Sequence, residues 1–142
     1  MKIDDIRFMK EALKEAKKGY GFTSPNPLVG AVIVRKGKIV SKGYHKRVGT
    51  DHAEVAAIKK MRGRTSPDDI LYVTLEPCNH HGRTPPCTEA ILRSGIQNLV
   101  IGMKDPNPGV KGGVAEYLAQ KGLNVICVVL EDECKKLNEA YI

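Results

Sequence analysis

The sequence is poor in large aromatic side chains and has no long apolar run. It contains no tryptophan and only two phenylalanines in 142 residues, so it offers few platforms on which nucleic-acid bases could stack. No segment of about eighteen consecutive apolar residues occurs, and residues 1–18 mix charged with apolar positions instead of forming a signal-peptide block. These absences argue against a nucleic-acid partner and a membrane segment, and they favour a soluble cytoplasmic protein.

Cysteine is also scarce for a protein held together by disulfides. The chain has four cysteines and no export signal, so metal binding or catalysis is a better interpretation than a disulfide framework. Cys127 lies in an apolar run and Cys134 in a charged helical stretch, and neither has a partner at a familiar ligand spacing. We expect both to be structural, whereas Cys78 and Cys87 stand in a different context.

Length and charge set further bounds. A chain of 142 residues is the size of one compact domain, and we expect residues 1–142 to form a single one. The formal net charge of +7 biases the surface toward anions such as phosphate esters. The alternative that lysine and arginine merely keep the protein soluble stays open, because the densest basic stretch, Arg35 to Arg47, overlaps a predicted hairpin.

Hydrophobic periodicity divides the chain into helices and strands. Apolar residues recur at helical spacing from Asp4 to Lys18, which predicts an amphipathic helix whose apolar stripe covers a sheet. Two β-rich runs, Val29–Val34 and Ile39–Tyr44, flank a glycine-containing turn and predict an antiparallel hairpin. The rest alternates as helix Ala53–Met61, strand Ile70–Thr74, helix Pro86–Ser94, strand Asn98–Gly102, helix Gly113–Lys121, strand Asn124–Leu130 and a helix from Asp132.

This alternation implies βαβ crossovers, and therefore an α/β fold in which helices cover both faces of a central mixed five-stranded sheet. No dinucleotide-binding Gly-x-Gly-x-x-Gly fingerprint is present, so we expect no reductase activity from these residues.

Two short motifs stand where a strand or loop leads into a predicted helix. His52-Ala53-Glu54 opens one helix, and Glu76-Pro77-Cys78 precedes Cys87, which opens the next. A helix N-terminus favours the thiolate that zinc requires. One histidine and two thiolates, from His52, Cys78 and Cys87, fill three positions of a tetrahedron, and the fourth is left for water, as in catalytic zinc sites.

Glu54 lies two positions from His52 and is predicted to reach the open position without being a ligand. A carboxylate there can take a proton from water and deliver it to a ring nitrogen and to departing ammonia. The pattern of zinc nucleobase deaminases is His-x-Glu followed by Pro-Cys-x-x-Cys, and this chain matches it except that Cys87 follows Cys78 by nine residues.

Three other interpretations of these residues stay open. His52 could be a buried histidine satisfied by backbone, Cys78 and Cys87 could form a disulfide, or His80 or His81 could complete a closed structural zinc site.

Four sequence blocks carry a resemblance to a known family. They are Ser-Pro-Asn-Pro-Leu-Val-Gly-Ala-Val from Ser24, His-Ala-Glu-Val-Ala-Ala from His52, Val-Thr-Leu-Glu-Pro-Cys-Asn-His-His-Gly-Arg-Thr-Pro-Pro-Cys-Thr from Val73, and Asp-Pro-Asn-Pro from Asp105. Over essentially the whole chain, the sequence resembles the deaminase domain of the riboflavin-biosynthesis deaminase-reductase family.

The resemblance implies a three-layer cytidine-deaminase-like fold with zinc. It implies hydrolytic deamination of 2,5-diamino-6-ribosylamino-4(3H)-pyrimidinone 5′-phosphate, with a reductase domain or a separate reductase as partner, and we expect a homo-oligomer. By position it assigns zinc to His52, Cys78 and Cys87 and proton transfer to Glu54. It assigns substrate contacts to Asn26, His45, His80, Arg83, Asp105 and Asn107.

Two positions depart from the pattern of many relatives. Arg83 stands where they have lysine, so a phosphate contact there would be bidentate in character. Val110-Lys111-Gly112-Gly113-Val114 differs from their Val-x-Gly-x-Gly, which leaves the path of that loop open. The alternative functions are deamination of a nucleic-acid base or a free base, such as tRNA adenosine, cytidine or guanine, and a non-catalytic zinc-stabilised interaction module.

Overall fold

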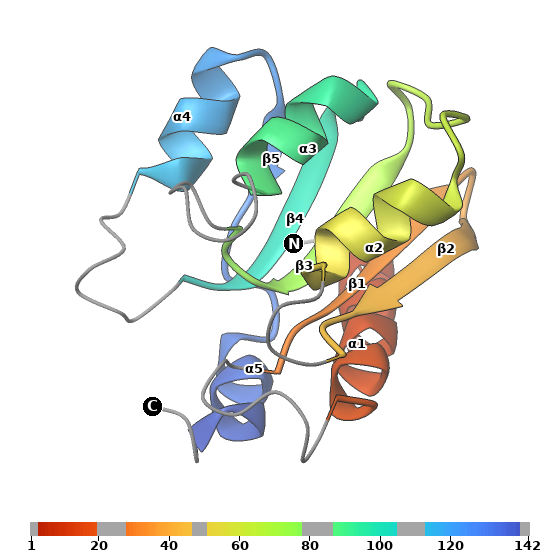
Figure 1. Cartoon of the computed structure of the whole chain (residues 1–142). Coiled ribbons are helices and arrows are strands. Elements are labelled where there is room, and N and C mark those ends of the chain that lie inside the picture. The colour runs from red at the N-terminus through yellow and green to blue at the C-terminus, as the bar shows by residue number, and fades with distance from the viewer. Residues whose placement is uncertain (1–2, 20–27, 47–50, 78–86, 105–112, 140–142) are drawn as a thin grey trace.

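In the computed structural model, the described residues form five helices and five strands in three layers (Figure 1). The structure describes residues 3–19, 28–46, 51–77, 87–104 and 113–139. The elements in chain order are α1 (Ile3–Lys17), β1 (Gly30–Arg35), β2 (Lys38–Tyr44), α2 (Ala53–Lys60), β3 (Ile70–Leu75), α3 (Cys87–Ser94), β4 (Asn98–Met103), α4 (Val114–Gln120), β5 (Asn124–Ile126) and α5 (Glu131–Leu137).

The sheet is mixed, as predicted. Its strand order is β2-β1-β3-β4-β5. β1 pairs antiparallel with both β2 and β3, whereas β3, β4 and β5 run parallel. Helices α3 and α4 supply the two crossovers that parallel pairing requires.

The two faces of the sheet bury different side chains. On one face α2, α3 and α4 pack over Ala31, Ile33, Leu71, Val73, Leu99 and Ile101. On the other face α1 lays Phe8, Met9 and Ala12 over Val32, Tyr72 and Val100, and α5 continues this layer through Cys134. The alternation of inward and outward residues along each strand therefore builds a core on both sides, which is the predicted α/β arrangement.

The β1–β2 hairpin follows from its turn residues. Arg35 pairs with Lys38, which leaves Lys36 and Gly37 as a two-residue turn with positive φ values of 50° and 77°. Two positive φ values match the right-handed twist of the flanking strands. The predicted hairpin is confirmed.

Helix α2 is fastened closely to β2. An added Cβ at Gly43 would lie 2.3 Å from the carbonyl oxygen of Ala53 and 2.6 Å from the amide of Ala57, so only glycine permits this approach. The Ser41 hydroxyl donates to the Ala57 carbonyl at 2.7 Å. These contacts fix the first turn of α2, which carries Glu54, against the sheet.

One predicted element is shorter than expected. The apolar run Asn124–Leu130 was expected to be one strand, but β5 ends at Ile126. Val128 and Leu130 have positive φ values of 60° and 59°, which a strand cannot contain. The Val129 amide still donates to the Ile101 carbonyl at 3.2 Å, so the chain bends while keeping Val129 buried.

The two cysteines outside the motifs occupy different environments. Cys127 lies just beyond β5 and is partly buried, whereas Cys134 is fully buried in α5. Burial raises the pKa of the Cys134 thiol to about 12, with Glu133 and Glu131 adding to the effect. None of the helices within the described ranges combines the length and apolar character that crossing a membrane requires.

Candidate active site

His52 and Glu54 enter the site from the start of α2. His52 is the N-cap residue, with extended φ and ψ values of −68° and 163°, and its carbonyl accepts the first helical hydrogen bond from Ala56 at 2.9 Å. Its side chain does not cap the helix. Glu54 lies in the first turn and is buried, with 3% of its surface exposed.

Cys87 meets these residues from a second helix. It is the first residue of α3, it is buried, and its Sγ lies 3.0 Å from Nδ1 of His52. Ligand atoms of His52, Glu54 and Cys87 all lie within 4.8 Å of one another. The structure thus brings an imidazole, a thiol and a carboxylate together at the N-termini of two packed helices.

His45 flanks this cluster from the end of β2. Its ring meets the His52 ring edge to face, with centroids 5.2 Å apart and an interplanar angle of 88°. Nδ1 of His45 lies 3.2 Å from the Asp51 carbonyl oxygen, which can only accept, so Nδ1 carries the proton. Burial lowers the pKa of His45, the Asp51 carbonyl opposes this, and His52 adds to the lowering. The lowered pKa favours the uncharged form of the ring.

The donor set fits zinc. A histidine nitrogen and a cysteine sulfur are ligands that zinc prefers, and here they lie 3.0 Å apart beside a carboxylate, so these residues could hold the ion. The Glu54 carboxylate is buried beside the ligand atoms of His52 and Cys87, in the first turn of the helix that His52 begins. This position is suited to proton transfer.

The described residues bear on only part of the alternative interpretations. Nδ1 of His52 lies 3.0 Å from the Cys87 sulfur, so this ring nitrogen has a side-chain neighbour and not only backbone around it. The disulfide between Cys78 and Cys87 depends on Cys78, which lies outside the described residues. The closed site completed by His80 or His81 depends on residues outside the described ranges.

Several predicted site residues also lie outside the described residues. They are Cys78, Asn26, His80, Arg83, Asp105 and Asn107. The described chain reaches Glu76 and Pro77, both buried, immediately before Cys78. The Glu76 amide donates to the Met103 carbonyl at 2.8 Å, so the end of β3 is held to the end of β4 where the chain leaves the sheet.

One neighbour of the site was missed from the sequence. The Asp51 carbonyl orients His45, and no side-chain pattern can reveal a contact made by backbone.

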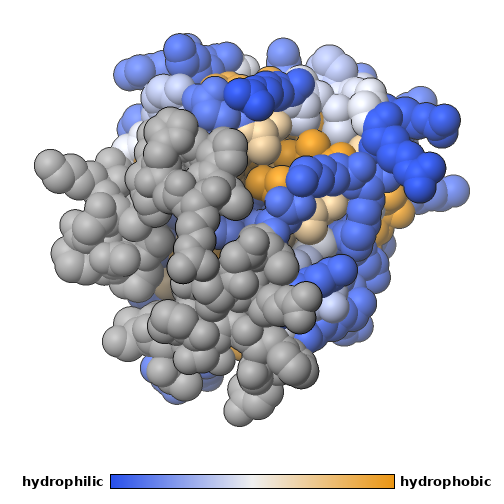
Figure 2. Space-filling view, viewed as in Figure 1, coloured by the Kyte–Doolittle hydropathy of each residue, from blue (hydrophilic) through white to orange (hydrophobic). Residues whose placement is uncertain are grey.

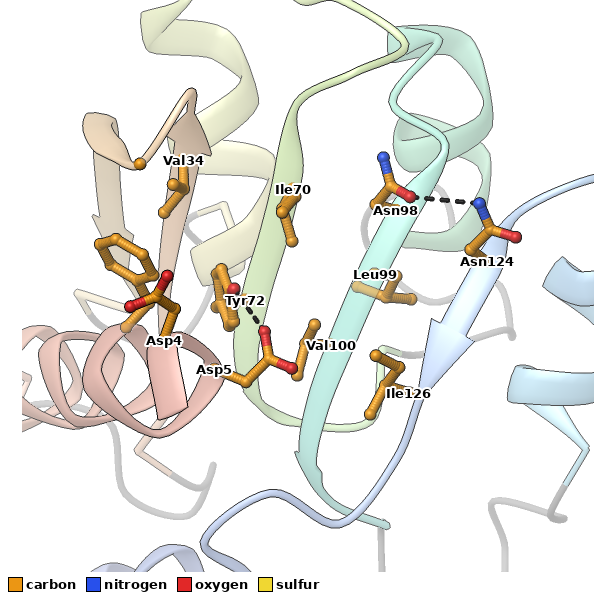
Figure 3. A pocket seen from close by; sticks show the side chains of 12 residues that line it. Asp4, Asp5, Val34, Ile70, Tyr72, Asn98, Leu99, Val100, Asn124 and Ile126 are labelled. Carbon is orange, nitrogen blue, oxygen red and sulfur yellow. Dashed lines mark hydrogen bonds between the residues drawn. The ribbon is translucent and has the colours of Figure 1, made fainter. Parts of the chain in front are cut away.

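A pocket lies away from this site, beside α1 on the opposite face of the sheet (Figure 3). It has a volume of about 270 Å³, and none of the candidate site residues within the described ranges lines it. There the Tyr72 hydroxyl donates to Asp5 Oδ1 at 2.7 Å.

Comparison with known proteins gives consistent matches. Residues 2–103 match the sequence profile of the cytidine and deoxycytidylate deaminase zinc-binding region. The chain is 51% identical over 137 residues to the riboflavin biosynthesis protein RibD of Aquifex aeolicus, covering 96% of this chain and 38% of that protein. It is 46% identical over 139 residues to the diaminohydroxyphosphoribosylamino-pyrimidine deaminase of Buchnera aphidicola, covering 98% of this chain and 94% of that protein.

A solved structure agrees. The crystal structure of a diaminohydroxyphosphoribosylaminopyrimidine deaminase/5-amino-6-(5-phosphoribosylamino)uracil reductase from Thermotoga maritima is similar with a TM-score of 0.90 and 48% identity. The match covers 97% of this chain and 40% of that one. This chain therefore spans about two fifths of the Aquifex and Thermotoga proteins and nearly all of the Buchnera protein.

Proposed function

Because the chain belongs to the family of cytidine and deoxycytidylate deaminases with a zinc-binding region, we propose that it is a zinc-dependent pyrimidine deaminase of riboflavin biosynthesis. Its substrate is 2,5-diamino-6-ribosylamino-4(3H)-pyrimidinone 5′-phosphate. One water is consumed, the bond from the ring to the 2-amino group breaks, and the products are 5-amino-6-(5-phosphoribosylamino)uracil and ammonia.

One observation carries the substrate assignment. The Buchnera relative, whose name states this pyrimidine deaminase activity, matches over 94% of its own length at 46% identity. The expected cytidine-deaminase-like fold is confirmed by the likeness to the Thermotoga structure.

The proposed metal ligands are His52, Cys78 and Cys87. The 3.0 Å separation between His52 Nδ1 and Cys87 Sγ supports two of them, and both side chains start from helix N-termini that point at one place. Cys78 is included because it follows the buried Glu76-Pro77 segment at the end of β3. When bound there, zinc supplies a Lewis acid that activates water toward the ring.

Glu54 is the proposed proton carrier. Its buried carboxylate lies within reach of the His52 and Cys87 ligand atoms, and burial keeps bulk water from competing for the proton. The carboxylate takes one proton from the attacking water and delivers it to a ring nitrogen. It then takes the second proton from the hydroxyl of the tetrahedral adduct and gives it to the amine, so that ammonia leaves as the carbonyl forms.

The proposed substrate contacts surround this centre. His45 is held by the Asp51 carbonyl, and its ring lies beside the His52 ring. Its lowered pKa favours the uncharged form, which adds no charge next to the proposed metal ligand. The other proposed contacts are Asn26, His80, Arg83, Asp105 and Asn107, with Arg83 reading the phosphate.

A reductase is the proposed downstream partner. The name of the Thermotoga protein joins this deaminase to a reductase that acts on the deaminated uracil, and the matched part of this chain corresponds to its deaminase portion. The product of this chain is then the substrate of a reductase, either in the same polypeptide or separate.

The chain is also proposed to form a homo-oligomer through α2 and α3. Figure 2 shows apolar side chains gathered at the surface between these helices. Val55, Ile58 and Ala90 line a groove of about 380 Å³ there. Because the same helices carry His52 and Cys87, a second copy packed on them would also stiffen the site. Sedimentation velocity of the protein and of a Val55→Lys variant tests this proposal, and an unchanged monomer in both would contradict it.

Ammonia release tests the function directly. The protein is given the phosphorylated diaminopyrimidine, its dephosphorylated form, cytidine, guanine and an RNA hairpin in separate reactions. The proposal expects kcat/KM to be highest for the phosphorylated diaminopyrimidine. A preference for cytidine, guanine or RNA would overturn it, and no release from any of them would favour a zinc-stabilised interaction module.

A further inference from the structure

A buried side-chain amide near the C-terminal end of the described chain binds the backbone just before β1. Asn138 follows α5 directly and is only 2% exposed. The Leu28 amide donates to Asn138 Oδ1 at 2.7 Å, and Asn138 Nδ2 donates to the Leu28 carbonyl at 2.9 Å. Figure 1 shows α5 beside the start of β1.

This pair of bonds is specific to an amide. The N–H of Leu28 needs an acceptor and its carbonyl needs a donor, and asparagine offers both on one rigid group. Two bonds to one residue fix its position and its orientation, as in a β ladder. A purely apolar side chain could fill the same space, but it would leave both backbone groups of Leu28 without these partners.

The two residues that follow are held as well. The Val29 carbonyl accepts from the His45 amide at 3.1 Å, and the Gly30 amide donates to Thr74 Oγ1 at 3.1 Å. Three separate parts of the fold, at the ends of α5 and β2 and within β3, thus hold three consecutive residues. In the sequence Asn26 lies two residues before this clamped segment, residues 28–30, and the His45 amide is hydrogen-bonded to it.

We propose that Asn138 is a positioning residue for substrate binding, a role that rests on the proposed function of the site. By fixing the Leu28 peptide, it also fixes the neighbouring Val29 carbonyl, which accepts from the His45 amide. The backbone of His45, whose ring lies against His52, is supported in this way. Asn138 itself touches no substrate, and the metal cluster on α2 and α3 does not depend on it.

The kinetic test compares Asn138→Leu with Cys134→Ala. Cys134 is buried in the same helix, so its truncation loosens the packing of α5 while leaving the bonds to Leu28 intact. For Asn138→Leu, the KM for the phosphorylated substrate should rise about tenfold while kcat stays within about twofold and zinc content is unchanged. Cys134→Ala should keep its KM. A loss of kcat and zinc together at constant KM would show a merely structural role and overturn the proposal.

Thr74→Val provides a second variant if Asn138→Leu does not fold. Valine has nearly the shape of threonine but removes the acceptor for the Gly30 amide. It should raise KM in the same direction. An unchanged KM in Thr74→Val would count against the clamped segment as a determinant of substrate binding.

A second readout does not depend on activity. The His45 amide donates to the Val29 carbonyl, so its hydrogen exchange under native conditions reports local opening of residues 28–30. Exchange of this amide should be roughly threefold faster or more in Asn138→Leu than in Cys134→Ala. Equal exchange rates would overturn the role of Asn138 whatever the substrate is. Faster exchange in a protein that deaminates none of the compounds tested would instead keep that role and reject the proposed function.

Discussion

The imidazole Nδ1 of His52 lies 3.0 Å from the sulfur of Cys87, although 35 residues separate them in the chain. The fold achieves this by aiming the N-termini of α2 and α3 at one point from the same face of the sheet. The approach is suited to sharing a metal ion, and it leads to the first prediction.

The purified protein should contain about one zinc per chain, and Cys87→Ala should lose most of it because a thiolate ligand is removed. Metal analysis by mass spectrometry measures this. Cys134→Ala removes an equally buried thiol outside the cluster and should retain the zinc. Full zinc content in Cys87→Ala would exclude Cys87 as a ligand.

Glu54→Gln should keep the zinc but reduce kcat by at least about 100-fold, since the amide preserves size and cannot carry the proton. Ammonia release and metal content are measured on the same preparation. Glu89→Gln, on the first turn of α3, gives a matched control that should turn over normally. Near-normal turnover in Glu54→Gln would move proton transfer to another group.

Arg83→Ala should lower kcat/KM for the phosphorylated substrate by an amount that corresponds to roughly 1.5–3 kcal/mol of transition-state binding, the scale of a hydrogen bond to a charged group. The kcat/KM for the dephosphorylated compound should hardly change. Steady-state kinetics with both compounds on both proteins separate the two effects. Equal losses on the two would mean that Arg83 shapes its loop. No loss on either would place phosphate recognition at another basic residue.

The buried Tyr72–Asp5 pair should make stability fall in alkali. Burial, the hydrogen bond to Asp5 and the Asp5 charge raise the pKa of Tyr72 above its ordinary 10.0, so folding favours the neutral phenol. The contribution of this raised pKa to the free energy of unfolding is complete below about pH 10, the ordinary pKa of the unfolded chain. It is lost as the pH rises from there toward the pKa of Tyr72 in the folded protein. Urea unfolding between about pH 8 and pH 11 should show a steeper decline for the parent protein than for Tyr72→Phe.

At neutral pH Tyr72→Phe should lower the free energy of unfolding by ~1–3 kcal/mol, because the Asp5 carboxylate loses its hydroxyl donor. Asp5 Oδ2 already has no hydrogen-bond partner in the described part of the chain. The double variant Asp5→Leu with Tyr72→Phe should recover much of that loss, since neither polar group is then buried alone. Tyr117→Phe, a partly exposed phenol, is the control for both measurements. An identical alkaline slope in Tyr72→Phe would remove the pair as the cause.

The sequence predicted the elements whose residues follow a simple period. The stripe of α1, the β-rich runs of β1 and β3 and the turn at Gly37 each carry a local signal, and all were confirmed. β5 was predicted too long because Val128 and Leu130 favour strands locally, while the bend that turns the chain toward α5 depends on the contact between Val129 and Ile101. Tertiary contacts of this kind leave no local pattern.

The residues of the site also divide into those that a local sequence signal predicts and those that depend on tertiary contacts. The positions of His52, Glu54 and Cys87 at helix starts were predictable because capping and spacing are local properties, and the structure brings the three together. The Asp51 carbonyl and the Asn138 amide act on backbone groups. A hydrogen bond to a backbone group can be made with any residue, so it leaves no side-chain pattern in the sequence from which it could be predicted.

The strand order leaves β2 and β5 at the two edges of the described sheet. Each edge strand exposes one apolar side chain, Val40 or Ile126, but each also has features that oppose pairing with another strand. β5 is only three residues long, and β2 is joined to β1 through a bulge and exposes Lys38 and Lys42. Short or lysine-bearing edges oppose the edge-to-edge growth that leads to fibrils. Pairing between the sheets of two copies is therefore disfavoured, and contacts with partners are expected at the helix surfaces instead.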